Sequence, residues 1–172
     1  LRAERLDVSD GPAVRAFFSG LEDDWPVDVL VNNAGIAANS PFLELTDELW
    51  DKTMNVNLKG AFHCAQAALV GMVARGGGVV LNIASTNGMR GQPLMAHYSA
   101  SKAGLISLSQ TLAVEFAPHG IRANCVCPGS IATELNLKDS GWSPEFLERL
   151  RGRIPAGRFG DPADVGWACA YL

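Results

Sequence analysis

Short apolar segments that alternate with helical patterns constrain the fold of this chain more than any other feature. Residues 27–32, 79–84 and 121–127 are too short for ordinary helices and are rich in apolar residues, as buried strands are. The near-continuous apolar character of residues 79–84 suits a strand that is covered on both faces of a parallel sheet. Strands that alternate with helices imply right-handed crossovers, so we predict an α/β fold with a doubly wound parallel sheet.

The stretches between these segments show helical patterns. Thr46 is a predicted N-cap, with Asp47 and Glu48 in the first turn, where the helix dipole favours acidic residues. The length of 172 residues fits one domain, which we expect to span residues 1–172. We also expect the end of a strand at residues 1–8, and helices at 11–21, after Thr46, at about 98–117, within 130–153 and from 164.

Composition excludes several classes of protein. Hydrophobic residues make up 48% of the chain and charged residues 19%, which argues against disorder. A net charge of −4 without a basic cluster argues against nucleic-acid binding. No apolar stretch approaches the length of a membrane span, and the first residues do not resemble a signal peptide. We expect a cytoplasmic protein without nucleic-acid or membrane partners.

The four cysteines, Cys64, Cys125, Cys127 and Cys169, lack the spacing of a zinc site. Cys125 and Cys127 lie two apart in a predicted strand, on the same face and too close in sequence for an ordinary disulfide. We interpret the cysteines as structural thiols in a reducing compartment and predict no metal, with metal binding as the weaker alternative.

Tyr98, Lys102 and Ser85 suggest chemistry. Tyr98 and Lys102 are four residues apart in a predicted helix and share one face. A tyrosine ionises near pH 10, and a nearby cation is expected to lower its pKa toward neutrality. Ser85 follows a predicted strand, at the end where open α/β sheets bind ligands. Taken singly, each residue has an ordinary structural explanation; together they favour carbonyl–alcohol chemistry.

Further motifs extend this pattern along the chain. They are D-V at residues 7–8, N-N-A-G at 32–35, N-V-N-L-K-G at 55–60, I-A-S at 83–85, Y-S-A-S-K at 98–102 and P-G-S-I-A-T at 128–133. In this order and spacing, the chain resembles the short-chain dehydrogenase/reductase family over all of its 172 residues. The resemblance implies a Rossmann-like fold and an enzyme that interconverts a carbonyl and a secondary alcohol with NAD or NADP.

The resemblance also implies roles for individual residues. The implied catalytic residues are Asn57, Ser85, Tyr98 and Lys102, with Tyr98 as the acid or base and Asn57 holding a water. The alternative interpretation of Asn57 is a structural residue at a kink in a helix. The implied cofactor contacts are Asp7, Val8, Asn33, Ala34, Gly35, Ile83, Tyr98, Lys102, Pro128, Gly129, Ile131 and Thr133.

One part of the family pattern is absent. The 172 residues contain no glycine-rich phosphate loop between a strand and a helix, and residues 76–78 precede a strand instead of following one. We interpret the sequence as an internal part of a longer enzyme, lacking the loop and the last strand of the family. We expect these residues alone to be inactive, and NAD or NADP preference is not encoded in them.

The substrate is the least determined property. Leu135, Leu137, Trp142 and Phe146 lie in the region of the family's substrate lid, where they either wall an apolar pocket or pack the lid helix. The acidic stretch after residue 43 disfavours an acidic carrier protein, so we favour a small alcohol, polyol or sugar over a 3-oxoacyl carrier-protein substrate. Alternatives of another class are an inert fragment and a non-catalytic interaction protein that retains the fold.

The predicted helix at residues 98–117 has two apolar stripes. Leu105, Leu108, Leu112 and Phe116 form one stripe, and Ile106, Ala113 and Ala117 form the second. A helix that packs on one sheet needs one stripe. The second stripe indicates either extra packing within the monomer or a helix–helix interface of a homodimer or homotetramer, which is how the family associates.

Overall fold

The computed structural model describes residues 2–21, 24–134 and 143–172. Three strands form one parallel sheet in the order β1-β2-β3, with β1 at Val29–Asn32, β2 at Gly78–Ile83 and β3 at Ile121–Val126. The α-helices are α1 Gly11–Ser19, α2 Asp47–Met54, α3 Gly60–Arg75, α4 Ala96–Phe116, α6 Pro144–Arg151 and α7 Pro162–Tyr171. Short helical turns are η1 Phe42–Glu44, η2 Asn55–Lys59, η3 Thr86–Gly88 and η4 Ala117–His119.

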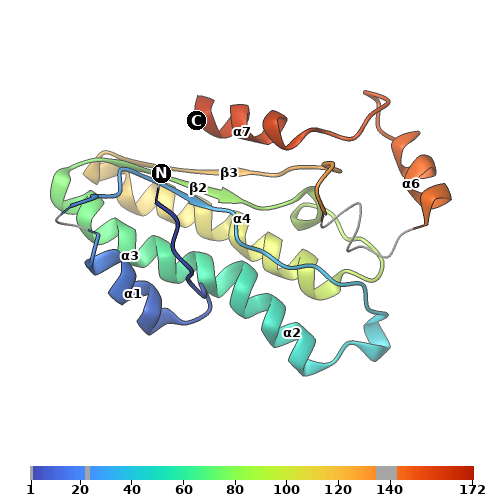
Figure 1. Cartoon of the computed structure of the whole chain (residues 1–172), viewed down its shortest axis with the longest axis horizontal. Coiled ribbons are helices and arrows are strands. Elements are labelled where there is room, and N and C mark those ends of the chain that lie inside the picture. The colour runs from blue at the N-terminus through green and yellow to red at the C-terminus, as the bar shows by residue number, and fades with distance from the viewer. Residues whose placement is uncertain (1, 22–23, 135–142) are drawn as a thin grey trace.

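The elements form three layers (Figure 1). Helices α3 and α4 cover one face of the sheet, with α1 beside α3, and α7 lies across the other face near β3. The α/β architecture and the parallel sheet predicted from the sequence are confirmed. The carboxyl ends of all three strands therefore meet at one edge of the sheet, the end that lies toward α6 in Figure 1.

Capping groups define where the helices start and stop. Thr46 accepts a hydrogen bond at Oγ1 from the Leu49 N–H at 3.2 Å, which confirms the predicted N-cap. Gly76 ends α3 in the left-handed conformation at φ 74°, which a glycine adopts without steric cost. The helix that we expected after Thr46 is divided, because the π-helical turn η2 joins α2 to α3.

The core lies between the sheet and the α1–α3–α4 layer. Val80 of β2 and Met72 of α3 are fully buried, and Leu112 of α4 packs into the same cluster. The buried members of this cluster are Val14, Phe18, Leu30, Cys64, Ala65, Ala68, Leu69, Met72, Val80, Leu112 and Ile121. This packing fixes α4 against β2 and β3 and thereby sets the position of the residues in its first two turns.

The sequence predicted the end of a strand at residues 1–8. This prediction is wrong for the described part of that stretch, because residues 2–8 form no strand. Val8 instead packs against α3, and its carbonyl lies 3.4 Å from Nδ1 of His63. The sheet of the described residues pairs β1 with β2 alone, so one edge of β1 carries unpaired backbone groups. Within the described ranges the segment before α1 has no neighbouring strand to join, which accounts for its irregular conformation.

Candidate active site

Ser85, Tyr98 and Lys102 come together at the carboxyl end of β2. Ser85 is the N-cap of η3, and its Oγ accepts a hydrogen bond from the Asn87 N–H at 3.1 Å. The Ser85 side chain also hydrogen-bonds the phenol of Tyr98. Nζ of Lys102 lies 5.7 Å from the centroid of the Tyr98 ring, one helical turn away. The structure thus brings these three predicted catalytic side chains together, and the fourth, Asn57, lies near Lys102 beside Gly35.

Lys102 is a buried ammonium, with a side chain anchored by a hydrogen bond to β2. The residue is 5% exposed, and Nζ donates to the Ile83 carbonyl at 2.7 Å. Burial lowers the pKa of Lys102 to about 8, against the opposing influence of the Cys125 and Cys127 thiols. Near pH 7 the side chain therefore remains mostly protonated, but it is poised to lose its proton just above neutrality.

We expected the ammonium of Lys102 to lower the pKa of Tyr98, and this prediction is wrong for this structure. Burial raises the pKa of Tyr98, and the hydrogen bond from Ser85 is what acts in the opposite direction. The ammonium points at the Ile83 carbonyl and not at the phenol oxygen, so loss of solvation outweighs any attraction between the two groups. Ser85, and not Lys102, is the group that favours the phenolate here.

Asn57 is buried and its carboxamide is fully engaged by the protein. Oδ1 accepts from the Ile36 N–H at 2.8 Å, and Nδ2 donates to the Ile36 carbonyl at 2.9 Å and to Ser101 Oγ at 3.2 Å. Its position in the middle of η2 agrees with the alternative of a residue at a helix kink. The side chain acts as a clamp between η2, the segment after β1, and α4.

Sequence reasoning missed Ser101 and Ile36. Ser101 is fully buried, and its Oγ accepts from Asn57 and donates to the Tyr98 carbonyl at 2.7 Å. The sequence contained a signal for this contact, because Ser101 lies three residues after Tyr98 and directly before Lys102. In a helix, that spacing places the Ser101 hydroxyl close to the turn that begins at Tyr98. Ile36 contributes only backbone atoms, which its side-chain type does not reveal.

The predicted cofactor residues that follow β1 form an open stretch. Asn33, Ala34 and Gly35 are exposed. A Cβ added at Gly35 would lie 3.4 Å from Asn57 Oδ1 and 3.5 Å from Lys102 Nζ, so the glycine keeps the space beside the ammonium open. Among the described residues Lys102 donates only to Ile83, which leaves N–H groups for a ligand such as a ribose diol. These features fit a nicotinamide dinucleotide.

Other predicted cofactor residues lie in the loop that follows β3. The Pro128 carbonyl accepts from the Thr86 N–H at 3.0 Å, which joins this loop to the Ser85 segment. Ile131 forms an isolated bridge with Gly160 before α7, and the Thr133 N–H donates to the Ile131 carbonyl at 2.9 Å. No atom of the described residues lies within 4 Å of a Cβ added at Gly129, so the described part of the chain leaves the backbone at this residue open.

Asp7 and Val8 lie in the turn that precedes α1. The Asp7 carboxylate accepts from the backbone and the hydroxyl of Ser9, which lowers the pKa of Asp7. Val8 packs against Gly60 at the start of α3. The Asp7 carboxylate is therefore engaged in a local turn.

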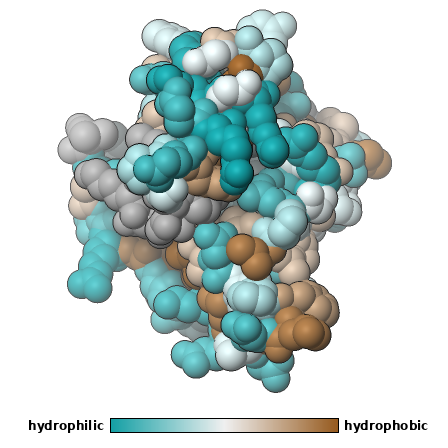
Figure 2. Space-filling view, turned by 90° about the vertical axis from the view of Figure 1, so that its right-hand side faces the viewer, coloured by the Kyte–Doolittle hydropathy of each residue, from teal (hydrophilic) through white to brown (hydrophobic). Residues whose placement is uncertain are grey.

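The lid region is described only in part. Leu135, Leu137 and Trp142 lie outside the described residues. Phe146 lies in α6, with the Arg149 guanidinium 5.3 Å from its ring centroid. Figure 2 looks onto this end of the molecule, where hydrophilic side chains dominate the upper part of the face and apolar side chains lie in the lower part. Phe42 and Leu43 of η1 are 74% and 97% exposed.

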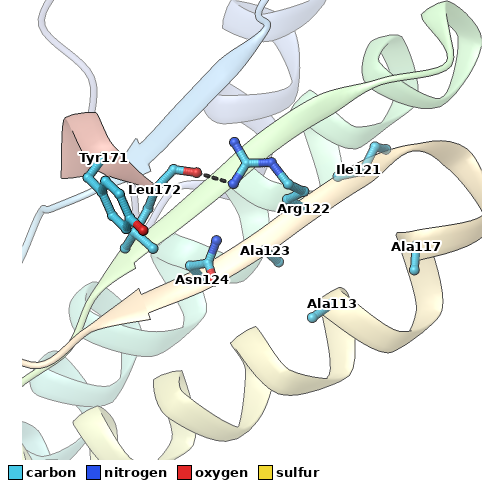
Figure 3. Close-up of a pocket in the computed structure, with 8 residues that line it drawn as sticks. All are labelled: Ala113, Ala117, Ile121, Arg122, Ala123, Asn124, Tyr171 and Leu172. Atoms are coloured by element: carbon cyan, nitrogen blue, oxygen red, sulfur yellow. Dashed lines mark hydrogen bonds between the residues drawn. The ribbon is translucent and has the colours of Figure 1, made fainter. Parts of the chain in front are cut away.

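A surface hollow lies away from the predicted site. Figure 3 shows it beside the edge of β3, between α4 and the end of α7. It is lined by Ala113, Ala117, Ile121, Arg122, Ala123, Asn124, Tyr171 and Leu172. None of these residues belongs to the predicted catalytic or cofactor set, so the hollow does not mark that site.

Comparison with known proteins agrees with the motifs. A family model described as enoyl-(acyl carrier protein) reductase matches residues 2–172. The chain belongs to the short-chain dehydrogenase/reductase family. Its parallel α/β sheet is the corresponding part of the Rossmann fold of this family.

Relatives in this family act on different substrates. An NAD(P)(+)-dependent L-rhamnose 1-dehydrogenase of Azotobacter vinelandii is 40% identical over 99% of this chain and 66% of its own length. An acetoacetyl-CoA reductase of Rhizobium meliloti is 42% identical over 98% of this chain and 69% of its own length. A gluconate 5-dehydrogenase of Burkholderia cenocepacia, solved with NADP and tartrate, superposes with a TM-score of 0.92 at 36% identity, over 97% of this chain and 66% of that one. The chain thus spans about two thirds of the length of these proteins.

In the described part of the chain, no helix is both long and apolar enough to cross a bilayer.

Proposed function

We propose that these residues form the catalytic part of an NAD- or NADP-dependent oxidoreductase that interconverts a secondary alcohol and a carbonyl. The cluster of Ser85, Tyr98 and Lys102 at the carboxyl end of β2 carries the proposal. The bound nicotinamide supplies the hydride acceptor or donor, and the protein supplies position and proton transfer. The dependence of the L-rhamnose relative on NAD(P)(+) supports the choice of cofactor.

Each side chain has a role that follows from its contacts. Ser85 Oγ accepts from the Asn87 N–H, and its own hydrogen, which bonds the Tyr98 phenol in this structure, would turn to a substrate oxygen on which negative charge develops. Tyr98 gives its proton to that oxygen in reduction and takes it back in oxidation. Lys102 supplies a cation beside the ring and free N–H groups for the ribose hydroxyls.

Asn57 contributes through position. Both ends of its carboxamide are bonded to Ile36, so the side chain does not contact substrate. A water that relays protons from Lys102 would be held by the main chain of Asn57 in the π-helical turn. The clamp keeps that turn against the segment that bears Gly35.

A conservative pair of variants tests the proposal, in a protein that joins this chain to the N-terminal part that its relatives have. Tyr98→Phe is expected to lower turnover by at least about a thousandfold, because it removes the positioned proton donor. Tyr171→Phe is the matched control, because Tyr171 is 90% exposed in α7. Near-normal turnover of Tyr98→Phe would refute the assignment.

For the substrate we propose a small alcohol, polyol or sugar. The L-rhamnose and gluconate relatives support this class, whereas the acetoacetyl-CoA relative supports the 3-oxoacyl alternative. Comparing kcat/KM for L-rhamnose and gluconate with that for acetoacetyl-CoA separates the two. A higher value for the thioester would favour the alternative.

We also propose that the protein self-associates through α4. Ile106 packs within the chain, against the Ala61, Ala84 and Leu105 cluster, so part of the second apolar stripe has an internal role. Ala117 is exposed and Val114 is 80% exposed, which leaves apolar surface uncovered. Ala113→Glu should lower the mass measured by light scattering, whereas Lys52→Glu on exposed α2 should not. An unchanged mass of folded Ala113→Glu would remove the argument.

A further inference from the structure

Buried polar side chains join the sheet to α4. Asn32 of β1 pairs with Asn82 of β2, and Nδ2 of Asn32 donates to Oδ1 of Asn82 at 2.9 Å. Nδ2 of Asn82 donates to the hydroxyl of Ser109 in α4 at 2.8 Å, and that hydroxyl donates to the Leu105 carbonyl at 2.7 Å. Asn82 is fully buried and Ser109 is 2% exposed. These hydrogen bonds form a continuous network from β1 through β2 to α4.

Burial of apolar surface alone does not require this network. Leu105 and Leu112 of α4 are buried in the apolar clusters between the helix and the sheet. An apolar residue in place of Asn82 would avoid the loss of solvation that a buried amide bears. Apolar contacts have no preferred direction, whereas a hydrogen bond requires its donor and acceptor at a narrow range of distance and angle. The network therefore fixes the position of α4 along β2 more narrowly than apolar packing does.

Lys102 attaches α4 to β2 at a second point, on the same face of the helix. Ser109 follows Lys102 by seven residues, which is about two helical turns, so the two side chains project in nearly the same direction. Their partners are consecutive residues of β2, because Ser109 bonds Asn82 and Lys102 bonds the Ile83 carbonyl at 2.7 Å. The hydrogen bond at Ser109 therefore limits the sliding of α4 that would break the bond between Lys102 and Ile83.

We propose that Asn82 and Ser109 are positioning residues that hold Tyr98 and Lys102 at the correct level beside the end of β2. The inference rests on the function proposed above, because it concerns the alignment of that site. Both residues are buried, so they act through the placement of α4 and not by contact with substrate. A shift of α4 along β2 moves Tyr98 and Lys102 relative to Ser85, and a misplacement of about 1 Å can lower a rate by about a hundredfold.

Turnover by a protein that joins this chain to the N-terminal part of its relatives tests the proposal. Ser109→Ala removes the acceptor of the Asn82 N–H and should lower kcat by at least about tenfold, whereas Ser109→Thr keeps the hydroxyl and should retain kcat. Val14→Ala is the matched control, because it removes packing from the buried face of α1 and should lower stability without lowering kcat of the folded protein. Full kcat of Ser109→Ala, with Tyr98→Phe inactive, would overturn the positioning role and leave the proposed function standing.

A second measurement does not use activity. Seven residues of helix span about 10.5 Å, and side chains this far apart without a shared partner ordinarily contribute additively to stability. If Ser109 and Lys102 hold α4 to the same part of β2, each attachment strengthens the other. Ser109→Ala should then lower the free energy of unfolding in urea at pH 7 by less in a Lys102→Met protein than in the unsubstituted one. Additive effects of the two changes would contradict the shared attachment, whether or not the joined protein is an active dehydrogenase.

Discussion

The buried ammonium of Lys102 is expected to make the stability of the chain rise with pH in a predictable window. The folded pKa is about 8 and the reference value is 10.5, a difference of about 2.5 units. At about 1.4 kcal/mol for each pKa unit, burial of the charged form costs about 3.5 kcal/mol of folding free energy. The side chain is 5% exposed, so screening by solvent reduces this cost little.

The sign follows from proton binding. Below pH 8 both states hold the proton, and the folded state bears the whole cost. Between pH 8 and 10.5 the folded state has released a proton that the unfolded state still holds, so the free energy of unfolding rises with pH. Above pH 10.5 neither state is charged at this residue and the cost disappears. The raised pKa of Tyr98 and of Cys125 acts in the opposite direction, which is why a variant is needed to isolate Lys102.

Lys102→Met removes the charge and keeps the length of the side chain. It also removes the hydrogen bond to Ile83, which is worth about 1.5 kcal/mol because its donor is charged. We therefore expect Lys102→Met to stabilise the chain by about 2 kcal/mol at pH 7 and to lose this advantage by pH 10.

Urea unfolding monitored by circular dichroism at pH 7 and at pH 10 measures the effect, with Lys52→Met on exposed α2 as the control. A difference between the Lys102→Met and unsubstituted chains that stays the same at both pH values would show that the folded state does not depress the Lys102 pKa.

Three further predictions concern the remaining parts of the site. In a chain that carries Tyr171→Phe, tyrosinate absorbance measures the ionisation of Tyr98 alone. Adding Ser85→Ala should raise the pKa of Tyr98 further, because the hydrogen bond that favours the phenolate is lost. A lower pKa would contradict the role of Ser85. Ser101→Ala removes the acceptor of one buried amide N–H of Asn57, so it should lower the free energy of unfolding by about 1–3 kcal/mol in urea unfolding. The control Ser107→Ala, on the exposed face of α4, should change this free energy little. Equal unfolding midpoints for the two variants would refute the clamp. The 172 residues alone should bind NAD(H) and NADP(H) negligibly, because they contain no phosphate loop, and saturable micromolar binding in calorimetric titration would show that the account of the loop is wrong.

The fold was predictable from the sequence wherever local and tertiary preferences coincide. The strands at Gly78–Ile83 and Ile121–Val126 are short and rich in apolar residues, so the pattern of the sequence alone located them within one residue. Thr46 was recognised because its hydroxyl satisfies a local N–H group. The strand expected at residues 1–8 failed because a strand depends on a neighbour, and its formation is not a property of the segment itself.

The clamp at Asn57 shows why part of the site was not predictable from sequence spacing. Asn57, Ile36 and Ser101 are 21 and 44 residues apart along the chain, and two of the three bonds to Asn57 use backbone atoms of Ile36. Spacing rules connect residues three or four apart, so they paired Tyr98 with Lys102 but did not reach this contact. The same limit explains the error over the Tyr98 pKa. A cation one turn away predicts a lowered value, but the ammonium points to the Ile83 carbonyl, and only the tertiary structure shows that direction. Lys102 therefore depends on β2 for its orientation, and a change at Ile83 that shifts this carbonyl should alter the site as much as a change in the helix that bears the lysine.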